Sequence, residues 1–352
     1  MQKTAIIYTP KYLDKSERNH PESPKRLKWI MNELCNCGLL ESGKCSLIEP
    51  EPAKIEDVEL VHDSDYIRLV KKVSEYGGGV LDLGDTVVGA KGFDTALLAV
   101  GGAMNAVNLV MERKFHNAFA LVRPPGHHAG PYYALGFCLF NNIAIAAIHL
   151  LKNFGLDRIL ILDVDAHHGN GTQEVFYETD RVLYASLHED PTGFPGTGFA
   201  DEVGEDKGTG YTVNIPFPFY IDDQTYLEAV DEIVLPIVRQ YKPQFILVSA
   251  GFDGHYSDPI GELSLSTFGY AETFKKILTL ASQCCDGKIV AVLEGGYSQD
   301  YLGIMTAAVI AEMSDATYSI KDRQSTATTH IKKLAKETLN DAKNIQSSFW
   351  NL

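Results

Sequence analysis

Two short segments of the sequence carry side chains that could hold a metal ion. In the first, Asp165 and His167 stand two residues apart at the end of an apolar run, so their side chains point the same way. In the second, the strand-like run 245–249 is followed by Gly251 and then Asp253. One imidazole and two carboxylates suit zinc or a similar divalent ion, with a fourth position open for water. An open position is typical of a catalytic metal site.

Two adjacent histidines could supply proton transfer beside such a metal. His127 and His128 lie in a Pro-Pro-Gly turn, and imidazoles exchange protons near neutral pH; in isolation, a surface-loop pair is the alternative. Asp163 precedes Asp165 by two residues and is placed to accept a hydrogen bond from a histidine and so fix its tautomer. Asn170 could orient the other ring without adding charge, although a structural role in its Gly-Asn-Gly turn is the alternative.

Three aromatic residues in glycine-bearing loops complete the candidate chemistry. Tyr297 follows two glycines, whose backbone freedom would let its phenol approach a bound carbonyl and stabilise a developing oxyanion. Phe137 and Phe194 could form the walls of a narrow slot for an aliphatic stem. On residue type alone, ordinary packing is the alternative for both phenylalanines.

The elements that must position these residues alternate along the chain. Apolar strand-like runs occur at residues 5–8, 118–122, 159–163, 182–186, 245–249 and 289–293. Helical patterns occur at residues 95–112, 141–153, 224–240 and 266–282. Near-continuous apolar strands alternating with helices predict an α/β fold, with a parallel sheet covered on both faces.

We expect a single domain over residues 1–352, because no repeat, low-complexity tract or linker divides the sequence. A last helix is expected at about residues 326–345, packed on the body through an apolar face. The chemically loaded segments all follow a strand. In open α/β sheets ligands bind outside the carboxyl ends of the strands, so these segments are expected to meet there.

The composition limits the kinds of partner that the protein is expected to bind. A net charge of −15 with no basic tract argues against direct nucleic-acid binding and favours cationic substrates. The apolar stretch 143–151 is too short to cross a membrane, and none is expected as a partner. The start of the chain has no signal-peptide pattern, and the six cysteines have no C-x-x-C spacing; reduced thiols and a cytoplasmic location are expected. The oligomeric state stays open, a homo-oligomer included.

Several motifs together resemble one family. They are Arg-Pro-Pro-Gly-His-His at 123–128, Asp-Val-Asp-Ala-His-His-Gly-Asn-Gly at 163–171, Ser-Leu-His at 186–188 with Phe-Pro-Gly-Thr-Gly at 194–198, Ser-Ala-Gly-Phe-Asp at 249–253 and Leu-Glu-Gly-Gly-Tyr at 293–297. In this order they resemble the histone deacetylase superfamily, closest to class II deacetylases, acetylpolyamine amidohydrolases and their bacterial and archaeal relatives. The similarity runs from His20 to about Tyr301. It implies the arginase/deacetylase fold, with an eight-stranded parallel sheet between helices.

The resemblance also implies roles for individual positions. By this resemblance, Asp165, His167 and Asp253 bind one Zn²⁺. His128 is the general base and acid, His127 with Asp163 is its electrostatic partner, and Tyr297 is the oxyanion donor. Gly136 makes a backbone contact with the substrate amide, and Phe137 and Phe194 form the walls of the tunnel. The same resemblance implies structural K⁺ at Asp163, Asp165, His167, Ser186 and Leu187, and a second K⁺ at Phe176, Thr179, Val182 and Tyr211. The resemblance implies an aspartate at position 170 in class I enzymes, and Asn170 instead agrees with the class II type.

The implied reaction is hydrolysis of an acetyl or related acyl amide, on an acetylated lysine peptide or a small acetylated amine. A dimanganese ureohydrolase is a rival, but its second metal needs an aspartate where Gly169 stands. A catalytically silent binding protein is a second rival, but this sequence keeps all three candidate metal ligands and the candidate oxyanion donor Tyr297. Polyamine-selective enzymes carry a rim glutamate where Ile260 stands, and the segment 76–94 is too short for their insertion. Glu262 and the overall acidity keep the polyamine alternative open.

Overall fold

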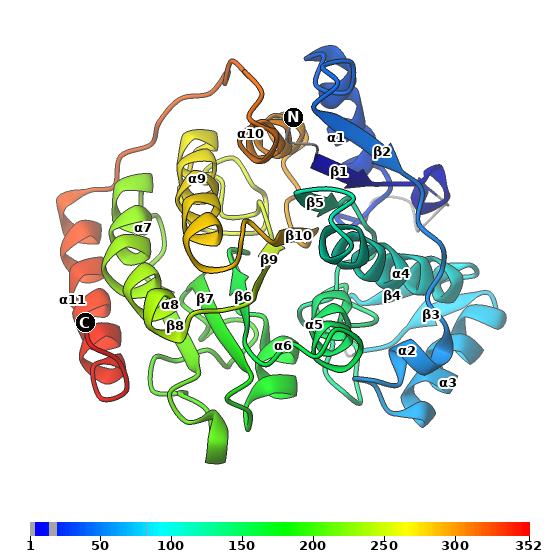
Figure 1. The fold of residues 1–352 in the computed structure, drawn as a ribbon, viewed down its shortest axis with the longest axis horizontal. Coiled ribbons are helices and arrows are strands. Elements are labelled where there is room, and N and C mark those ends of the chain that lie inside the picture. The colour runs from blue at the N-terminus through cyan, green and yellow to red at the C-terminus, as the bar shows by residue number, and fades with distance from the viewer. Residues whose placement is uncertain (1–3, 14–19, 83) are drawn as a thin grey trace.

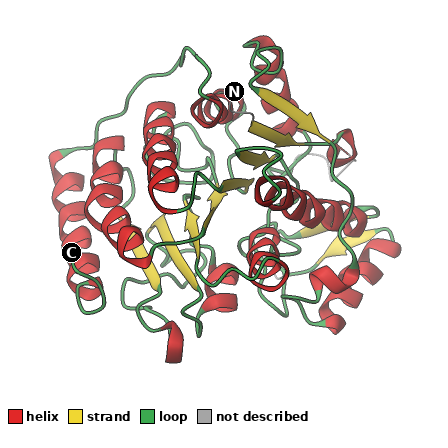
Figure 2. Ribbon diagram, in the orientation of Figure 1, coloured by secondary structure: helices red, strands yellow, loops and turns green. Residues whose placement is uncertain are grey.

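Eight parallel strands form the centre of the protein, in a computed structural model that describes residues 4–13, 20–82 and 84–352. The strand order across the sheet is β2-β1-β5-β10-β9-β6-β7-β8 (Figures 1 and 2). In chain order the strands are β1 (Thr4–Ile7), β2 (Cys45–Ile48), β5 (Asn117–Ala120), β6 (Ile159–Asp163), β7 (Val182–Glu189), β8 (Thr212–Phe217), β9 (Phe245–Ala250) and β10 (Ile289–Leu293). A separate antiparallel pair joins β3 (Gly78–Val80) to β4 (Val87–Gly89).

Helices cover both faces of the sheet. One layer packs around α4, which contacts β1, β5 and β10; its members are α4 (Gly92–Met111), α5 (Asn142–Asn153) and α6 (Asn170–Phe176). The other layer holds α1 (Lys25–Asn36), α7 (Asp223–Ala229), α8 (Leu235–Tyr241), α9 (Thr267–Cys284), α10 (Leu302–Ser314) and α11 (Thr329–Gln346). The remaining helical elements are α2 (Ile55–Val58), α3 (Ser64–Glu75), η1 (Pro10–Leu13), η2 (Asp206–Gly208) and η3 (Val230–Val234). The predicted α/β fold with a covered parallel sheet is confirmed.

The six predicted strands are the six inner strands of the sheet, β1, β5, β10, β9, β6 and β7. Strands β5, β6, β7, β9 and β10 are buried along their whole length, which is why their sequences are nearly continuous apolar runs. The prediction lacked β2 and β8, which are the two edge strands. Their sequences break the apolar pattern, since β2 is partly exposed and β8 contains Asn214 and Pro216. Proline is tolerated at an edge because no neighbour needs its missing N–H.

The helix predicted at 224–240 consists of α7, the π-helical turn η3 and α8 in succession. Pro236 lies in the first turn of α8 and has no N–H to continue the hydrogen bonds of a regular α-helix, so the helix widens just before it. The helix α4 is long and apolar enough to match a membrane span by length and composition. Most of it is buried inside the fold, as the core helix of a globular protein would be.

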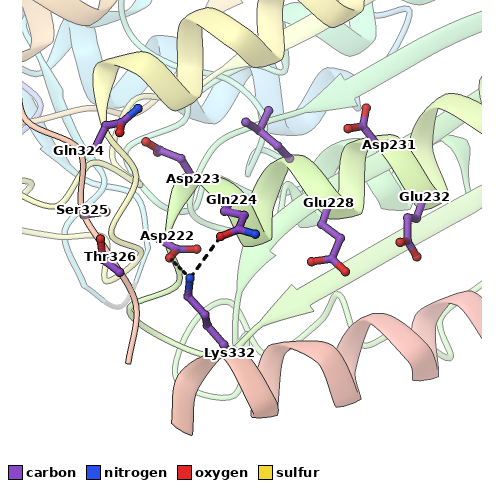
Figure 3. Close-up of a pocket in the computed structure, with 11 residues that line it drawn as sticks. Asp222, Asp223, Gln224, Glu228, Asp231, Glu232, Gln324, Ser325, Thr326 and Lys332 are labelled. Atoms are coloured by element: carbon purple, nitrogen blue, oxygen red, sulfur yellow. Dashed lines mark hydrogen bonds and ion pairs between the residues drawn. The ribbon is translucent and has the colours of Figure 1, made fainter. Parts of the chain in front are cut away.

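The predicted C-terminal helix is α11, which lies beside α7 at the outer edge of the molecule (Figure 1). Its N-cap Thr328 accepts a hydrogen bond from the Ile331 N–H. Lys332 reaches from α11 across a groove to Asp222 and Gln224 at the start of α7 (Figure 3). The helix is therefore docked by polar contacts at its beginning as well as by its buried apolar side chains.

Candidate active site

Three potential metal ligands converge where strands β6 and β9 end. These two strands are neighbours in the sheet, so the segments that follow them lie side by side. The Nδ1 atom of His167 lies 3.0 Å from Asp253 Oδ2 and 3.3 Å from Asp165 Oδ1. Both carboxylates are buried at 1% exposure. The structure thus brings together Asp165, His167 and Asp253, three residues of the types that bind a divalent ion.

The charges of this group suit a bound cation. Two buried carboxylates face one imidazole, and burial together with the charge of Asp165 raises the pKa of Asp253. Burial opposes protonation of His167, but the two carboxylates raise the pKa of that imidazole well above its usual value. Even a protonated His167 would balance only one of the two negative charges. A divalent ion would balance both, so the donor set and its charge fit a bound metal.

Backbone groups hold the two carboxylates in place. Asp165 Oδ2 accepts a hydrogen bond from the Gly295 N–H at 2.8 Å, and Asp253 Oδ1 accepts one from the Ala166 N–H at 2.9 Å. A side chain at position 295 would collide with both carboxylates, so only glycine lets the β10 loop come this close. The backbone therefore fixes the orientation of both carboxylates.

The two adjacent histidines have different partners. Their ring centroids are 4.0 Å apart. His127 Nδ1 lies 3.0 Å from Asp163 Oδ2, whereas His128 Nδ1 lies 2.8 Å from the amide oxygen of Asn170. Each predicted orienting side chain is thus within hydrogen-bonding distance of one ring.

These partners shift the pKa values of the two rings in opposite directions. Burial acts to lower the pKa of His127, but the charges of Asp165 and Asp163 outweigh it and raise that pKa to about 10. Burial and the neighbouring charge of His127 hold the pKa of His128 well below its ordinary value. The surroundings of His127 therefore favour its protonated form, and those of His128 favour its neutral form.

A cavity of about 330 Å³ opens above these residues. Phe137, Phe194, Gly136, Ile260 and Tyr297 line it, together with the two histidines and the three candidate metal ligands. The Phe194 ring meets His128 edge-on at 4.9 Å between centroids, and Phe137 meets Tyr297 edge-on at 5.8 Å. Gly136 and Phe137 both have positive φ angles, 53° and 68°, which turn the loop into the cavity. The two phenylalanines thus flank the approach to the site.

The cavity is strongly acidic. Besides Asp165 and Asp253, its wall contains Asp85, Glu189, Asp190 and Glu262, and none of the described residues that line it is lysine or arginine. Burial raises the pKa of Glu189 to about 7, and its Oε1 lies 3.6 Å from His167 Nε2. Sequence analysis had noted Glu262 but not Asp85, Glu189 or Asp190, because single acidic residues in loops carry no distinctive spacing.

Arg26 was also not selected from the sequence, although it touches Tyr297 directly. Its guanidinium is 1% exposed, donates to the carbonyl oxygens of Gly296 at 2.6 Å and Glu294 at 2.5 Å, and lies 4.8 Å from the centre of the Tyr297 ring. Glu22 pairs with both Arg26 and Arg123, so one buried carboxylate lies between two buried guanidinium groups. The only sequence signal for Arg26 was that it lies within the region of family similarity, which begins at His20.

Glu294 and Asp258 hold the backbone around the site. Glu294 Oε2 accepts hydrogen bonds from the N–H groups of Gly126 and His127, at 2.7 and 3.2 Å. Asp258 Oδ2 accepts a hydrogen bond from the Tyr297 N–H at 2.7 Å. These carboxylates connect loops that are far apart in the sequence, so no local pattern could reveal them.

The residues implied for potassium fall into two groups around β7. Ser186 and Leu187 lie in the second half of β7, where Ser186 pairs in register with Asp163, close to the candidate metal ligands. Val182 begins β7 at the opposite end; Phe176 ends α6, Thr179 lies between them, and Tyr211 precedes β8. The second set is therefore remote from the cavity.

Fold and site together define a protein of the arginase/deacetylase fold. Residues 20–313 match the family model of the histone deacetylase domain. The crystal structure of the HDA15 HD domain superposes with a TM-score of 0.88 at 34% sequence identity, covering 99% of this chain and 95% of that one.

Two curated relatives agree. A probable deacetylase of Archaeoglobus fulgidus is 44% identical over 99% of this chain and 98% of its own length. A histone deacetylase-like amidohydrolase of Pseudomonas aeruginosa is 36% identical over 86% of this chain and 79% of its own. The chain belongs to the histone deacetylase family.

Proposed function

We propose that this protein is a zinc-dependent amidohydrolase that removes acetyl or related acyl groups from N-acetylated lysine or amines. The observation that carries the proposal is the convergence of Asp165, His167 and Asp253 with His128 and Tyr297 around one cavity. Zinc held by the three ligands would polarise the substrate carbonyl and lower the pKa of a water molecule towards about 7.

His128 is the proposed general base and acid. Its low pKa keeps the imidazole neutral, and the Asn170 amide oxygen can hold the hydrogen on Nδ1, leaving Nε2 free to accept. It takes a proton from water as oxygen bonds to the acyl carbon, and gives a proton to the nitrogen as the C–N bond breaks. The products are a carboxylate and a free amine. The cationic His127 beside it stabilises negative charge in the transition state.

Tyr297 is the proposed oxyanion donor. Burial raises the pKa of its phenol well above the ordinary value, so the hydroxyl stays protonated and able to donate. The Arg26 guanidinium lies against the Tyr297 ring, and the Asp258 carboxylate accepts a hydrogen bond from the Tyr297 N–H. The donor is thus pre-organised towards the cavity rather than recruited by the substrate.

The acidic rim supports a substrate that carries positive charge beyond the scissile amide. The acylated stem itself is neutral and suits the slot between Phe137 and Phe194. Asp190 and Glu262 at the rim would favour a second cationic group, as in a basic acetyl-lysine peptide or an acetylated polyamine. Ile260 stands where polyamine-selective relatives place a glutamate, which favours the peptide.

The test uses metal-depleted protein reloaded with Zn²⁺ and a panel of acetyl-lysine peptides and acetylated polyamines, with acetate release as the readout. We expect one zinc per chain and hydrolysis of at least one class. Asp253→Ala should lose both bound zinc and activity, whereas Asp157→Ala, at an exposed aspartate, should keep both. Two ions in a bridged cluster would support a ureohydrolase instead, and zinc binding without turnover would support a silent binding protein.

Two further parts of the proposal rest on family resemblance. Structural potassium at the two groups of residues around β7 would be held largely by backbone carbonyls, and K⁺-dependent thermal stability would test it. A cytoplasmic location is proposed because reduced thiols suit a reducing compartment, and all six cysteines are free.

A further inference from the structure

Asp322 is a buried carboxylate outside the region that matches the family model, which ends at residue 313. It belongs to the irregular segment 315–328 between α10 and α11, called the C-terminal linker below. Its side chain is 0% exposed. Its Oδ2 accepts hydrogen bonds from the His255 ring Nε2 at 3.0 Å and the Thr267 N–H at 2.8 Å. Its Oδ1 accepts two more, from the Tyr256 hydroxyl and the Arg323 N–H, both at 2.7 Å.

A chain of hydrogen bonds leads from Asp322 towards the active site. On the far side of the His255 ring, Nδ1 lies 2.8 Å from the Ser257 hydroxyl, which lies 2.7 Å from the Ser298 hydroxyl. Because a carboxylate only accepts, His255 Nε2 carries the hydrogen, and in the neutral ring Nδ1 accepts from Ser257. Ser257 in turn accepts from Ser298. The acceptor at one end therefore sets the direction of every bond.

At its far end, this series of hydrogen bonds contacts the loop that carries Tyr297. Ser298 is the next residue, and its N–H donates to Asp258 Oδ2 at 3.1 Å, on the same carboxylate oxygen that accepts from Tyr297. The Tyr301 ring lies against His255, with centroids 4.7 Å apart and planes inclined by 31°. The loop is thus held through a side chain, two backbone groups and a ring.

We propose that Asp322 is a positioning residue for Tyr297 and that the C-terminal linker braces the oxyanion donor of the active site. The inference rests on the role proposed for Tyr297. It makes turnover depend on a segment that the matched domain does not include. Asp322 touches no substrate; it acts through His255, Ser257 and Ser298.

The expected effect is on turnover rather than on substrate binding. An oxyanion donor must stay within about 2.7–3.1 Å of the developing charge, and a misplacement of about 1 Å can cost roughly 10²-fold in rate. A loosened brace shifts the donor only part of the time. For Asp322→Ala we expect kcat to fall roughly 10-fold with KM changed less than about threefold.

The experiment compares four variants of the full-length, zinc-loaded protein. Asp322→Ala removes all four hydrogen bonds, and Asp322→Asn keeps the shape but loses the charge. Ser298→Ala cuts the chain at its far end with minimal change in volume. Asp315→Asn is the matched control, because Asp315 lies in the same linker with its side chain 92% exposed.

Two readouts are combined. The first is kcat and KM with an acetyl-lysine peptide. The second is hydrogen–deuterium exchange of the peptide spanning 294–301, which contains the Tyr297 and Ser298 amides. We expect faster exchange there and lower kcat in Asp322→Ala and Ser298→Ala, smaller changes in Asp322→Asn, and none in the control.

The proposal that Asp322 positions Tyr297 is overturned if kcat stays within about twofold of wild type in Asp322→Ala. It is also overturned if kcat falls while exchange rises equally over the whole chain, since that pattern describes general destabilisation. If the wild-type protein hydrolyses no acetylated amine, the proposed function fails instead, and the exchange data still decide whether Asp322 holds the loop.

Discussion

At the scale of single residues, neighbouring charges give two chemically identical side chains different roles. His127 and His128 are both buried, yet one faces the carboxylate of Asp163 and the other the amide of Asn170. A carboxylate stabilises the imidazolium, while an amide oxygen does so only weakly. The surroundings of the pair therefore favour the charged form of His127 and the neutral form of His128, and a neutral imidazole is the form that can act as the proposed general base.

His128→Ala should lower kcat/KM by roughly 10²–10⁴-fold while zinc content stays unchanged, because proton transfer is lost and no metal ligand is removed. Steady-state kinetics and metal analysis of the same preparation measure both. His330→Ala is the control, since His330 is exposed on α11. His62 would be a poor control because it is buried and hydrogen-bonded to Gly130 and Asn141. Turnover near wild type would exclude His128 as the base.

Tyr297→Phe should lower kcat by roughly 10²-fold or more and leave KM nearly unchanged. The phenol is proposed to stabilise charge that develops only in the transition state, and phenylalanine keeps the ring against Arg26 and Phe137. Steady-state kinetics with an acetyl-lysine peptide give both constants. A variant that keeps its kcat while KM rises would make Tyr297 a substrate-binding residue.

At the scale of elements, one carboxylate joins the start of α7 to the start of α11. Asp222 caps α7 by accepting from the N–H and the hydroxyl of Thr225, at 3.1 and 2.9 Å. Its other oxygen accepts from the Ala327 N–H and pairs with Lys332, both at 3.0 Å (Figure 3). The last helix is thus tied to the body by a residue that is itself a helix cap.

Asp222→Ala should destabilise the protein by about 2–3 kcal/mol, because the cap is lost and the Ala327 amide loses its acceptor. Lys332→Ala should cost less than about 1 kcal/mol, since its side chain is 37% exposed and the ion pair is partly screened. Urea unfolding of both variants and the wild type measures the difference. Equal losses in the two variants would mean that the ion pair, rather than the cap, holds α11.

At the scale of the whole molecule, a buried histidine links global stability to pH. His62 is 2% exposed, and burial lowers its pKa to about 4. In the unfolded chain its pKa is about 6.5, so between these values the unfolded state binds the proton more readily. The contribution of His62 is complete above about pH 6.5 and is lost as the pH falls towards 4. The full effect is about 3 kcal/mol.

Urea unfolding at about pH 7 and about pH 4.5 tests this expectation. The wild type should lose roughly 2–3 kcal/mol more between these pH values than His62→Gln, which keeps a donor and an acceptor but does not titrate there. The comparison cancels other groups that titrate in both proteins. An equal loss in wild type and variant would show that His62 does not carry the acid sensitivity.

The inner part of the fold could be predicted from the sequence, and its edges could not. Strands β6, β9 and β10 are buried on both faces, so their apolar runs are long and unbroken. The edge strands β2 and β8 have one side without a neighbour, and their mixed sequences resemble loops. Helix α4 was predicted from its long apolar pattern, with its start three residues late.

The sequence by itself determined which residue types could do chemistry. Asp165 and His167 share a side because successive side chains in extended backbone alternate, and that periodicity is local. Only the tertiary structure decided what surrounds them. Arg26 meets Gly296, and Asp322 meets His255, across separations of 270 and 67 residues. Such contacts depend on the order of strands in the sheet and on the paths of the loops beyond it, which no spacing along the chain encodes.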